Sequence, residues 1–410
     1  MSISRRNLFY YLALAGGLIY GGSRIVPTKE SEFTPEMFGA RGDGLTSDGA
    51  AFAQLISAVN EVGGALECTI VCRGRYVITG GPRLTQSFNR QSVKGTIEGI
   101  PPLTRSNVTV DARGAEFIVP PDYHWRRTKK GGDAKDQFAV GWQFLGANCK
   151  MIGGKILGNL DKREVIRGPN PSGFGGREFG LIMQGDGWEL IDVHVENWGT
   201  DCLLIGAPGR SLNGVYKGAR RNCVSVIPLV DFSADSYAEI NGGRITDGGN
   251  WPEDVRNNPG AGIDIEGLSN DCHAVVKISG VEFDQNHQKD LQVSRGALNC
   301  VVENCTFTNN VKFQPEQEGG HRFIDNKFFG EARIDTIFGM AANAPIVFDG
   351  NDFEVRENRP FRQNLIKGVS RDKQGQRVVF INNRAVNWTG DFSKIPLFRD
   401  GNVFENNRTG

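Results

Sequence analysis

The chain has little of what builds a metal centre or a disulfide framework. Its 410 residues include eight cysteines and five histidines, no two cysteines form a C-x-x-C pair, and the histidines do not cluster with them. Eight cysteines are too sparse to hold together a fold of this length. Most of them lie in apolar, strand-like runs, where a free cysteine behaves as a small core residue. The sequence therefore predicts no metal site and no disulfide-built fold.

An excess of charge of either sign is also absent, because 47 Lys and Arg residues balance 47 Asp and Glu residues. No global field therefore favours nucleic acid or an anionic membrane as a partner. The phosphate-binding patterns G-x-x-x-x-G-K-[ST] and G-x-G-x-x-G are missing. After residue 62 no long helical pattern recurs, which excludes a doubly wound α/β fold.

Glycine is abundant, with 54 residues, and asparagine and aspartate are frequent. These residues tolerate positive φ, so a chain rich in them turns often. A unit of Gly, Asn or Asp followed three residues later by an apolar residue recurs, with the apolar residue at Phe283, Phe307, Phe328, Phe353, Ala385 and Phe404. The steps of 24, 21, 25, 32 and 19 residues fit the coils of a solenoid that stack to share one core.

A helix is predicted over residues 49–60. Its apolar residues follow the i, i+3, i+4, i+7 spacing of one helical face, and they are Phe52, Leu55, Ile56 and Val59. Asp48 precedes the helix as its N-cap, and Gly63-Gly64 ends it. We expect this helix to cover the open end of a solenoid, because exposed β edges need cover.

The run Phe38-Gly-Ala-Arg-Gly-Asp-Gly44, with Asp48 and the helix after it, resembles the N-terminal signature of the pectate-lyase-like β-helix superfamily. That superfamily includes polysaccharide lyases, polygalacturonase-like hydrolases and phage tailspike depolymerases. The resemblance implies an all-β fold, a right-handed parallel β-helix with an N-terminal capping helix. The expected organisation is an export signal or short anchor over 1–26, the cap over 33–64, and a single β-helix with groove-lining insertions over 65–410.

The N-terminal segment indicates export. Arg5-Arg6 precede an apolar run from Leu8 to about Tyr20, which is too short to span a bilayer comfortably but suits a signal segment. The paired arginines resemble a twin-arginine export signal. A basic N-terminus before an ordinary signal or short anchor is the alternative. Either predicts a periplasmic or extracellular protein with no stable membrane span beyond this segment.

The sharpest candidate for chemistry is the run Gly262-Ile-Asp264-Ile-Glu266. In a strand, Asp264 and Glu266 point to the same outward face, with Cα atoms about 6.6 Å apart. Inverting glycosidases hold their carboxyl groups about 6.5–9.5 Å apart to admit a water, and retaining enzymes about 5–5.5 Å. The pair is therefore predicted to supply one general acid and one base. A solvent-facing acidic strand or a cation site is the alternative.

Three further residues are predicted to support this pair. Asn197-x-x-x-Asp201 resembles, loosely, the first catalytic-region motif of polygalacturonases, so Asp201 is a third catalytic candidate. The stretch from Arg220 to Ile227 resembles the coil between the two motifs, so Arg220, Arg221 or Asn222 is expected to face the groove, and Arg221 to bind substrate. His194 is predicted to point outward from its strand and to bind substrate, although most outward histidines are surface residues.

Insertions over 119–137, 158–179 and 248–260 are predicted to line the groove, since solenoid insertions collect on one face. The proposed substrate-binding residues on them are Trp125, Arg126, Arg127, Trp251 and Arg256. Aromatic rings pack against sugar C–H faces, and arginine binds carboxylates or sulfates. The dense basic run over 126–130 favours an acidic polysaccharide. Ordinary solvated loops are the alternative.

These features together predict an exported carbohydrate-active enzyme that cleaves glycosidic bonds of an acidic polysaccharide, with a glycoside hydrolase favoured. A polysaccharide lyase, with Ca²⁺ as its cofactor, and a C5 epimerase are the alternatives on the same fold; otherwise no cofactor is expected. A non-catalytic polysaccharide-binding protein, adhesin or spike is the alternative of a different class. The chain lacks the Asp-Asp, Gly-His-Gly and Arg-Ile-Lys motifs of true polygalacturonases and the Trp-Ile-Asp-His motif of calcium pectate lyases.

Overall fold

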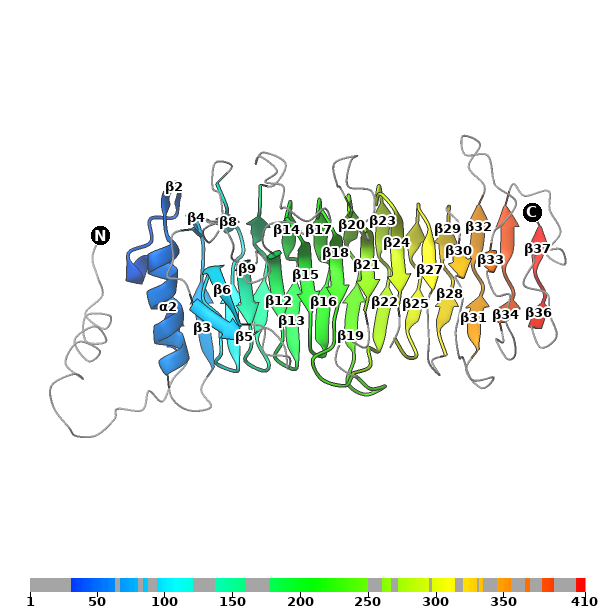
Figure 1. Cartoon of the computed structure of the whole chain (residues 1–410), viewed down its shortest axis with the longest axis horizontal. Helices are drawn as coiled ribbons and strands as arrows, with labels where there is room; N and C mark the ends of the chain where they lie inside the picture. Colours follow the sequence, from blue (N-terminus) through cyan, green and yellow to red (C-terminus); the bar gives the residue numbers. More distant parts are fainter. Residues whose placement is uncertain are drawn as a thin grey trace.

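The computed structural model describes residues 31–62, 67–79, 84–87, 94–120, 137–159, 177–249, 260–266, 272–294, 297–313, 320–329, 332–334, 345–354, 366–368, 378–386 and 403–409. These residues form three long sheets that run side by side along an elongated solenoid (Figure 1). Every neighbouring pair of strands is parallel except β5 and β6, which are antiparallel. Parallel crossovers of this kind are right-handed. The chain is a right-handed parallel β-helix, as the sequence predicted.

Sheet A comprises, in order along the solenoid, β1 (Ser31–Phe33), β3 (Cys68–Val71), β7 (Val108–Asp111), β10 (Lys150–Ile152), β13 (Trp188–Ile191), β16 (Gly209–Leu212), β19 (Ala238–Asn241), β22 (Val276–Ser279), β25 (Val301–Glu303), β28 (Arg322–Ile324), β31 (Ile346–Asp349), β34 (Val378–Ile381) and β36 (Val403–Glu405).

Sheet B comprises β2 (Asp43–Ser47), β4 (Arg75–Val77), β8 (Glu116–Ile118), β11 (Lys155–Leu157), β14 (His194–Glu196), β17 (Val215–Lys217), β20 (Arg244–Thr246), β23 (Glu282–Asp284), β26 (Thr306–Phe307), β29 (Lys327–Phe328), β32 (Asp352–Glu354), β35 (Arg384–Val386) and β37 (Arg408–Thr409).

Sheet C comprises β5 (Leu84–Ser87), β6 (Lys94–Gly99), β9 (Gln137–Phe144), β12 (Arg177–Met183), β15 (Asp201–Ile205), β18 (Asn222–Val226), β21 (Ala261–Ile265), β24 (Lys289–Val293), β27 (Val311–Phe313), β30 (Ala332–Ile334) and β33 (Ile366–Gly368).

The N-terminal end of the solenoid is covered by helix α2 (Gly49–Glu61), which follows the short 3₁₀ helix η1 (Pro35–Phe38) (Figure 1). The predicted apolar stripe is the buried face of α2, which confirms the capping role. Asp48 stands at the N-cap position, but its side chain does not cap the helix. It accepts hydrogen bonds from the main-chain N–H of Arg41 at 2.7 Å and of Val77 at 3.3 Å, and so ties the preceding loop to β4.

The predicted phenylalanine repeat forms a stack inside the solenoid. The ring centroids of Phe283 and Phe307 lie 4.8 Å apart, those of Phe307 and Phe328 5.0 Å, and those of Phe328 and Phe353 4.8 Å. The Gly, Asn or Asp three residues earlier has positive φ in each described copy: Gly280, Asn304, Asp325, Gly350 and Asn382. The repeat therefore pairs a left-handed turn residue with an inward apolar residue. All eight cysteines are also buried, and none is bridged.

A second ladder consists of asparagines that the sequence repeat did not reveal. Asn326, Asn351, Asn383 and Asn407 occupy equivalent turns of four successive coils. Each donates its side-chain N–H to a main-chain carbonyl of an earlier coil, at 2.7–2.9 Å. Each also accepts, at 2.9 Å, a main-chain N–H of the preceding coil. The ladder satisfies main-chain groups at a corner where the sheets interrupt their own hydrogen bonding.

The parallel sheets begin before residue 65, because β1 pairs with β3 and β2 pairs with β4. The predicted cap over 33–64 therefore contributes strands as well as α2. The predicted leader over 1–26 lies outside the described residues. No helix within the described part of the chain is long and apolar enough to cross a membrane.

The asparagine ladder generates the first prediction. Asn351→Ala leaves the main-chain N–H of Asn326 and the carbonyl of Phe323 without their partner. We expect the free energy of unfolding to fall by about 2–4 kcal/mol, the cost of two buried polar groups left unsatisfied. Denaturant unfolding measures this. Asn241→Ala, on an exposed residue of sheet A, is the control and should change stability by less than about 0.5 kcal/mol. Equal losses in the two variants would contradict a specific role for the ladder.

Candidate functional site

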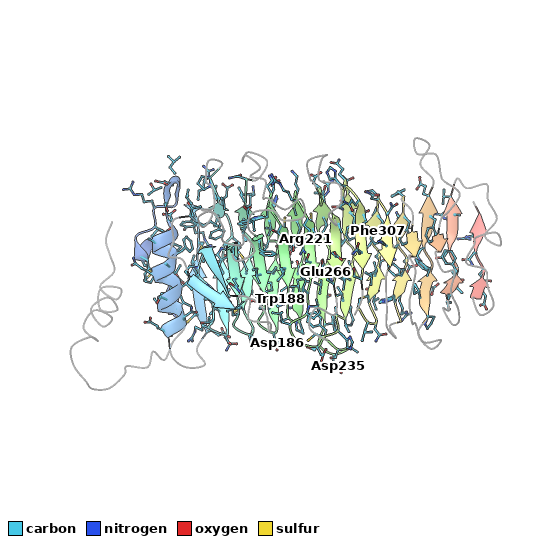
Figure 2. All side chains as sticks on the ribbon, viewed as in Figure 1. Asp186, Trp188, Arg221, Asp235, Glu266 and Phe307 are labelled. Carbon is cyan, nitrogen blue, oxygen red and sulfur yellow. The ribbon has the colours of Figure 1, made fainter. Side chains whose placement is uncertain are left out.

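Four adjacent strands of sheet C, namely β15, β18, β21 and β24, carry a cluster of polar side chains on their outer face. The strand register places Asp201 beside Asn222, and Ser225 beside Asp264. Arg221, immediately before β18, and Glu266, immediately after β21, complete the cluster. Figure 2 shows Arg221 and Glu266 near the middle of the solenoid. The structure thus brings together four of the predicted site residues.

Asp201 and Arg221 form a buried, two-pronged ion pair. Arg221 Nε donates to Oδ1 of Asp201 at 2.9 Å, and Nη2 donates to Oδ2 at 2.6 Å. Nη2 also donates to Ser225 Oγ at 3.1 Å. Asp201 is 0% exposed, whereas the Arg221 side chain is 24% exposed. Such a fork fixes the guanidinium plane, so Asp201 serves to hold Arg221 and does not itself reach the surface.

Asp264 points out of the solenoid core, as predicted, but it does not face solvent. It is 1% exposed, because side chains from the neighbouring coils cover it. Asn222 Nδ2 lies 3.4 Å from its Oδ2, and Ser294 Oγ lies 3.3 Å from its Oδ1. The expectation of a solvent-facing acidic strand is therefore wrong for this residue. A side chain on the outer face of a stacked sheet has a side chain from each of the two adjacent strands beside it. Where these neighbours are polar and of similar length, they shield it from solvent.

The pKa of Asp264 is raised to about 8. Burial is the main cause, followed by the negative charge of Glu266 and a hydrogen bond between the two carboxyl groups. The charges of Arg221 and Lys289 act in the opposite direction. Asp264 is therefore a proton-bearing acid at neutral pH, next to a second carboxyl group.

Glu266 is the accessible member of the pair. Its main-chain N–H donates to the carbonyl of Val226 at 2.9 Å, and its side chain is 34% exposed. Arg221 Nη1 lies 3.6 Å from Glu266 Oε1. The negative charge of Glu266 is one of the causes that raise the pKa of Asp264.

The three predicted insertions share one corner of the solenoid. The segment before β9, the segment before β12 and the segment before β21 each connect a strand of sheet B to a strand of sheet C. All three therefore precede strands of sheet C, and the third leads into β21, which carries Asp264. The predicted binding residues Trp125, Arg126, Arg127, Trp251 and Arg256 on these insertions lie outside the described residues.

His194 does not join the cluster. It lies on β14 of sheet B, where its Nε2 is 3.0 Å from Oε2 of Glu196. Burial lowers its pKa, which the negative charge of Glu196 opposes. Conversely, Ser225 and Ser294 belong to the cluster although sequence reasoning did not single them out. Only the register between coils places these two hydroxyl groups beside Arg221 and Asp264.

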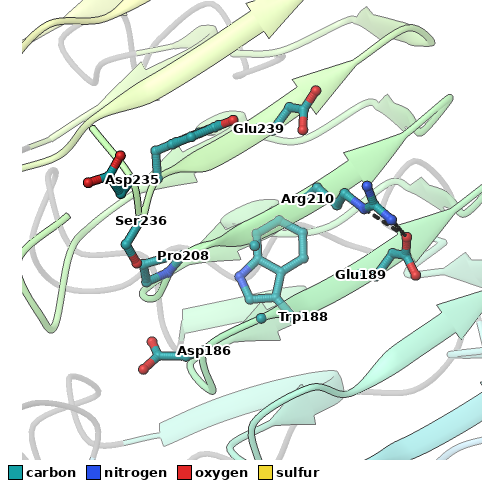
Figure 3. Close-up of a pocket in the computed structure, with 11 residues that line it drawn as sticks. Asp186, Trp188, Glu189, Pro208, Arg210, Asp235, Ser236 and Glu239 are labelled. Carbon is teal, nitrogen blue, oxygen red and sulfur yellow. Dashed lines mark hydrogen bonds and ion pairs between the residues drawn. The ribbon is translucent and has the colours of Figure 1, made fainter. Parts of the chain in front are cut away.

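A pocket of about 490 Å³ opens on a different face, over β13, β16 and β19 of sheet A (Figure 3). Its charged lining is mainly acidic, with Asp186, Asp235 and Glu239, and its Arg210 is paired with Glu189 (Figure 3). The indole of Trp188 is only 1% exposed, so it cannot serve as a platform for a sugar ring. The pocket therefore brings together fewer groups that could bind a sugar or transfer a proton than the cluster on sheet C does. No group of three or more His, Cys, Asp or Glu side chains in the described ranges is placed to hold a metal ion.

No protein-family model matches the sequence, and no curated protein matches it. Among solved structures, the chain is similar to the A-module of a mannuronan C-5 epimerase from Azotobacter vinelandii, at 13% identity and a TM-score of 0.47, over 92% of this chain and 99% of that one. It is similar to PfbA, a surface adhesin of Streptococcus pneumoniae, at 10% identity and a TM-score of 0.43, over 87% of this chain and 85% of that one. It is also similar to an alginate lyase from Paenibacillus sp. str. FPU-7, at 11% identity and a TM-score of 0.37, over 94% of this chain and 100% of that one. At such identities the likeness concerns the fold alone.

The raised pKa of Asp264 makes stability depend on pH. The native state keeps a proton that the unfolded state releases near pH 3.9. Its contribution to stability is complete below that pH and is lost as pH rises toward 8. Asp264→Asn cannot ionise, so we expect the variant to be more stable than the wild type at pH 9. In a chain of 410 residues a gain of about 1 kcal/mol would raise Tm by about 1 °C, and the difference should shrink toward pH 5.

Thermal melts between pH 5 and pH 9 measure this difference. Asp186→Asn, at an exposed position on the sheet A pocket, controls for the removal of one carboxyl group elsewhere. Curves of Tm against pH that run parallel for the wild type and Asp264→Asn would show that Asp264 ionises normally.

Proposed function

We propose that this chain is an exported carbohydrate-active enzyme that cleaves glycosidic bonds of a polysaccharide bound across the outer face of sheet C. The observation that carries the proposal is the buried, proton-bearing Asp264, in contact with the accessible Glu266 and beside the fixed guanidinium of Arg221. Titratable groups perturbed in this way collect at functional sites. The segments that carry the three predicted insertions each lead into a strand of sheet C.

Asp264 is the proton donor in this mechanism, and substrate binding must move the covering side chains of Asn222 and Ser294 aside for it to reach the leaving oxygen. A general acid works best when its pKa lies near the operating pH, and burial brings Asp264 there. As the glycosidic C–O bond breaks, its electron pair passes to the leaving oxygen, which takes the proton from Asp264. The carboxylate that remains is stabilised by Arg221 and Lys289, whose charges favour the ionised form.

Glu266 is the base in hydrolysis. It removes a proton from the water that attacks the anomeric carbon, so the water adds as hydroxide and the sugar gains a new hydroxyl group. Glu266 lies close enough to Asp264 for its negative charge to favour the protonated form of that residue. Its partial exposure and its position just beyond the end of β21 allow a bound sugar to displace it. The proton then returns to Asp264 and restores the pair.

Arg221 binds and orients, and Asp201 is its positioning residue. The edge of the guanidinium that carries Nη1 is turned toward Glu266, while the other edge is held by Asp201 and Ser225. A cation fixed in this way can bind a sugar hydroxyl or carboxylate next to the reacting bond. Because Asp201 is fully buried, it acts on the substrate only through Arg221.

Elimination is the second candidate, since it needs an acid and a base side by side, and Asp264 on β21 is followed by Glu266 directly after the strand. A lyase needs no attacking water: a base removes the proton beside a uronate carboxylate, a double bond forms, and the glycosidic oxygen leaves with a proton from the acid. Glu266 and Asp264 reach the substrate from the same side, which suits both transfers, and Arg221 would neutralise the uronate carboxylate.

Substitutions at the pair test the proposal. We expect Asp264→Asn and Glu266→Gln each to lower kcat by about 10²–10⁴-fold, the usual contribution of general acid–base catalysis. Turnover on a panel of polysaccharides is the measurement, with Asp186→Asn as the control. New reducing ends without ultraviolet absorbance indicate hydrolysis, and an unsaturated uronate indicates elimination. A wild-type protein that binds glycans but turns over none of them would contradict the proposed enzymatic function. It would instead support the alternative of a non-catalytic binding protein.

Arg221 provides a separate test through the pH profile. Its positive charge lowers the pKa of Asp264, so Arg221→Gln should raise that pKa further. The general acid then stays protonated to higher pH, and the alkaline limb of kcat against pH should move upward. Arg221→Lys keeps the charge and should leave the limb near its wild-type position while weakening substrate binding. A merely structural Arg221 would lower activity in both variants without moving the limb.

A further inference from the structure

The two side chains that cover Asp264 are held with different firmness. Asn222 is 0% exposed; its Oδ1 accepts the main-chain N–H of Ala261 at 3.0 Å, and its Nδ2 donates to Ser225 Oγ at 3.0 Å. Ser294 follows directly after β24 and is partly exposed, and its hydroxyl group makes one hydrogen bond besides the contact with Asp264. Ser294 is therefore the cover that a bound sugar moves more easily.

Two side chains of β24 hold the hydroxyl group of Ser294. Gln292 Nε2 donates to Ser294 Oγ at 2.7 Å, and Lys289 Nζ donates to Gln292 Oε1. An ammonium group has donors only, so Lys289 faces the amide oxygen of Gln292 and turns the amide nitrogen toward Ser294. Because Nε2–H occupies one side of Ser294 Oγ, the hydroxyl hydrogen is directed to Oδ1 of Asp264, 3.3 Å away.

Ser294 is bound more closely to Gln292 than to Asp264. The distance of 2.7 Å from Gln292 Nε2 to Ser294 Oγ is that of a short hydrogen bond, whereas 3.3 Å exceeds the usual range for an O–H···O bond. Gln292 is 9% exposed and in register with Asp264, so strand pairing fixes its place beside the acid. The hydroxyl group can therefore leave Asp264 while its oxygen stays on Gln292.

We propose that Ser294 is a gate over Asp264, and that Gln292, oriented by Lys289, is the positioning residue that holds this gate. The inference rests on the proposed function and adds the step that uncovers its acid. When a sugar binds, Ser294 moves toward Gln292 and its hydroxyl hydrogen turns from Asp264 to an oxygen of the sugar. Once Asp264 has given up its proton, the hydroxyl group turns back and donates to the carboxylate.

The gate acts differently on the two protonation states of Asp264. A hydrogen bond to an ionised group is roughly twice as strong as one between neutral groups. The hydroxyl group of Ser294 is therefore held weakly while Asp264 carries its proton, and held firmly after the proton has left. The gate thus opens easily over an acid that is ready to donate and closes over one that has already donated.

A pair of variants of equal size at the gate tests the hydrogen bond without any substrate. Ser294→Thr keeps the hydroxyl group, and Ser294→Val replaces it with a methyl group. Infrared difference spectra against Asp264→Asn follow the protonated carboxyl group of Asp264 as the pH rises. A donor to the ionised form lowers a pKa, so the midpoint should lie about 0.5–1 pH unit lower in Ser294→Thr than in Ser294→Val.

The matched control is the same pair of changes at Ser236, an exposed serine of the sheet A pocket, where the two midpoints should be equal. Equal midpoints for the Ser294 pair, or a higher midpoint with threonine, would overturn the gate, since the hydroxyl group would then not donate to the carboxylate.

Steady-state kinetics test the movement of the gate. Ser294→Ala removes the group that the sugar must displace and also a donor to the carboxylate, so KM and kcat should both fall, each by about two- to tenfold. Ser294→Thr should restore both. Gln292→Leu should raise KM in the wild type and leave it unchanged in Ser294→Ala, because Gln292 acts only through the hydroxyl group. A fall in kcat without a fall in KM, or an equal effect of Gln292→Leu in both backgrounds, would contradict the gate.

Failure of the gate and failure of the proposed function give different results. If a polysaccharide is cleaved and Asp264→Asn abolishes the cleavage, but the Ser294 pair shows equal midpoints, the gate is wrong and the catalytic proposal stands. If the midpoints differ as expected and no polysaccharide of the panel is cleaved, Ser294 donates to Asp264 as inferred and the catalytic proposal falls.

Discussion

In-register stacking of successive coils is the constraint on which the rest of this structure depends. Each residue of a strand lies about 4.8 Å from the equivalent residue of the next coil. A side chain at a given position therefore packs against the side chains at the same position of the neighbouring coils. Inside, this stacking turns Phe283, Phe307, Phe328 and Phe353 into a continuous column of rings. At one corner it turns asparagines into a hydrogen-bonded ladder that satisfies the main chain.

The same constraint creates the chemistry of the candidate site. Asp264 is an outward residue of a strand, and in an isolated strand it would be solvated. Neighbours from the adjacent coils, Asn222 and Ser294, close over it, so burial and the adjacent Glu266 favour its protonated form. A raised pKa of this kind weakens the native state as pH rises, which is a cost at an ordinary position and an advantage for a proton donor.

The three sheets differ on their outer faces. On sheet A, Glu189 pairs with Lys150 and Arg210, and on sheet B, Asp352 pairs with Arg384. On sheet C, Val140, Phe179 and Ile182 form a small buried apolar cluster, and the acid cluster follows it along the axis. The helix α2 closes the N-terminal end of the solenoid.

Features that depend on short spacing could be predicted from the amino-acid sequence. The stripe of Phe52, Leu55, Ile56 and Val59 defined the capping helix, and the turn-residue repeat defined the coils, because each is set by neighbours within one element. The alternation around Asp264 correctly placed that carboxyl group outside the core. The burial of Asp264, the ion pair of Arg221 with Asp201 and the position of His194 on sheet B could be found only from the folded chain. These depend on register between coils, and coils separated by 19 to 32 residues leave that register free until the strands pair.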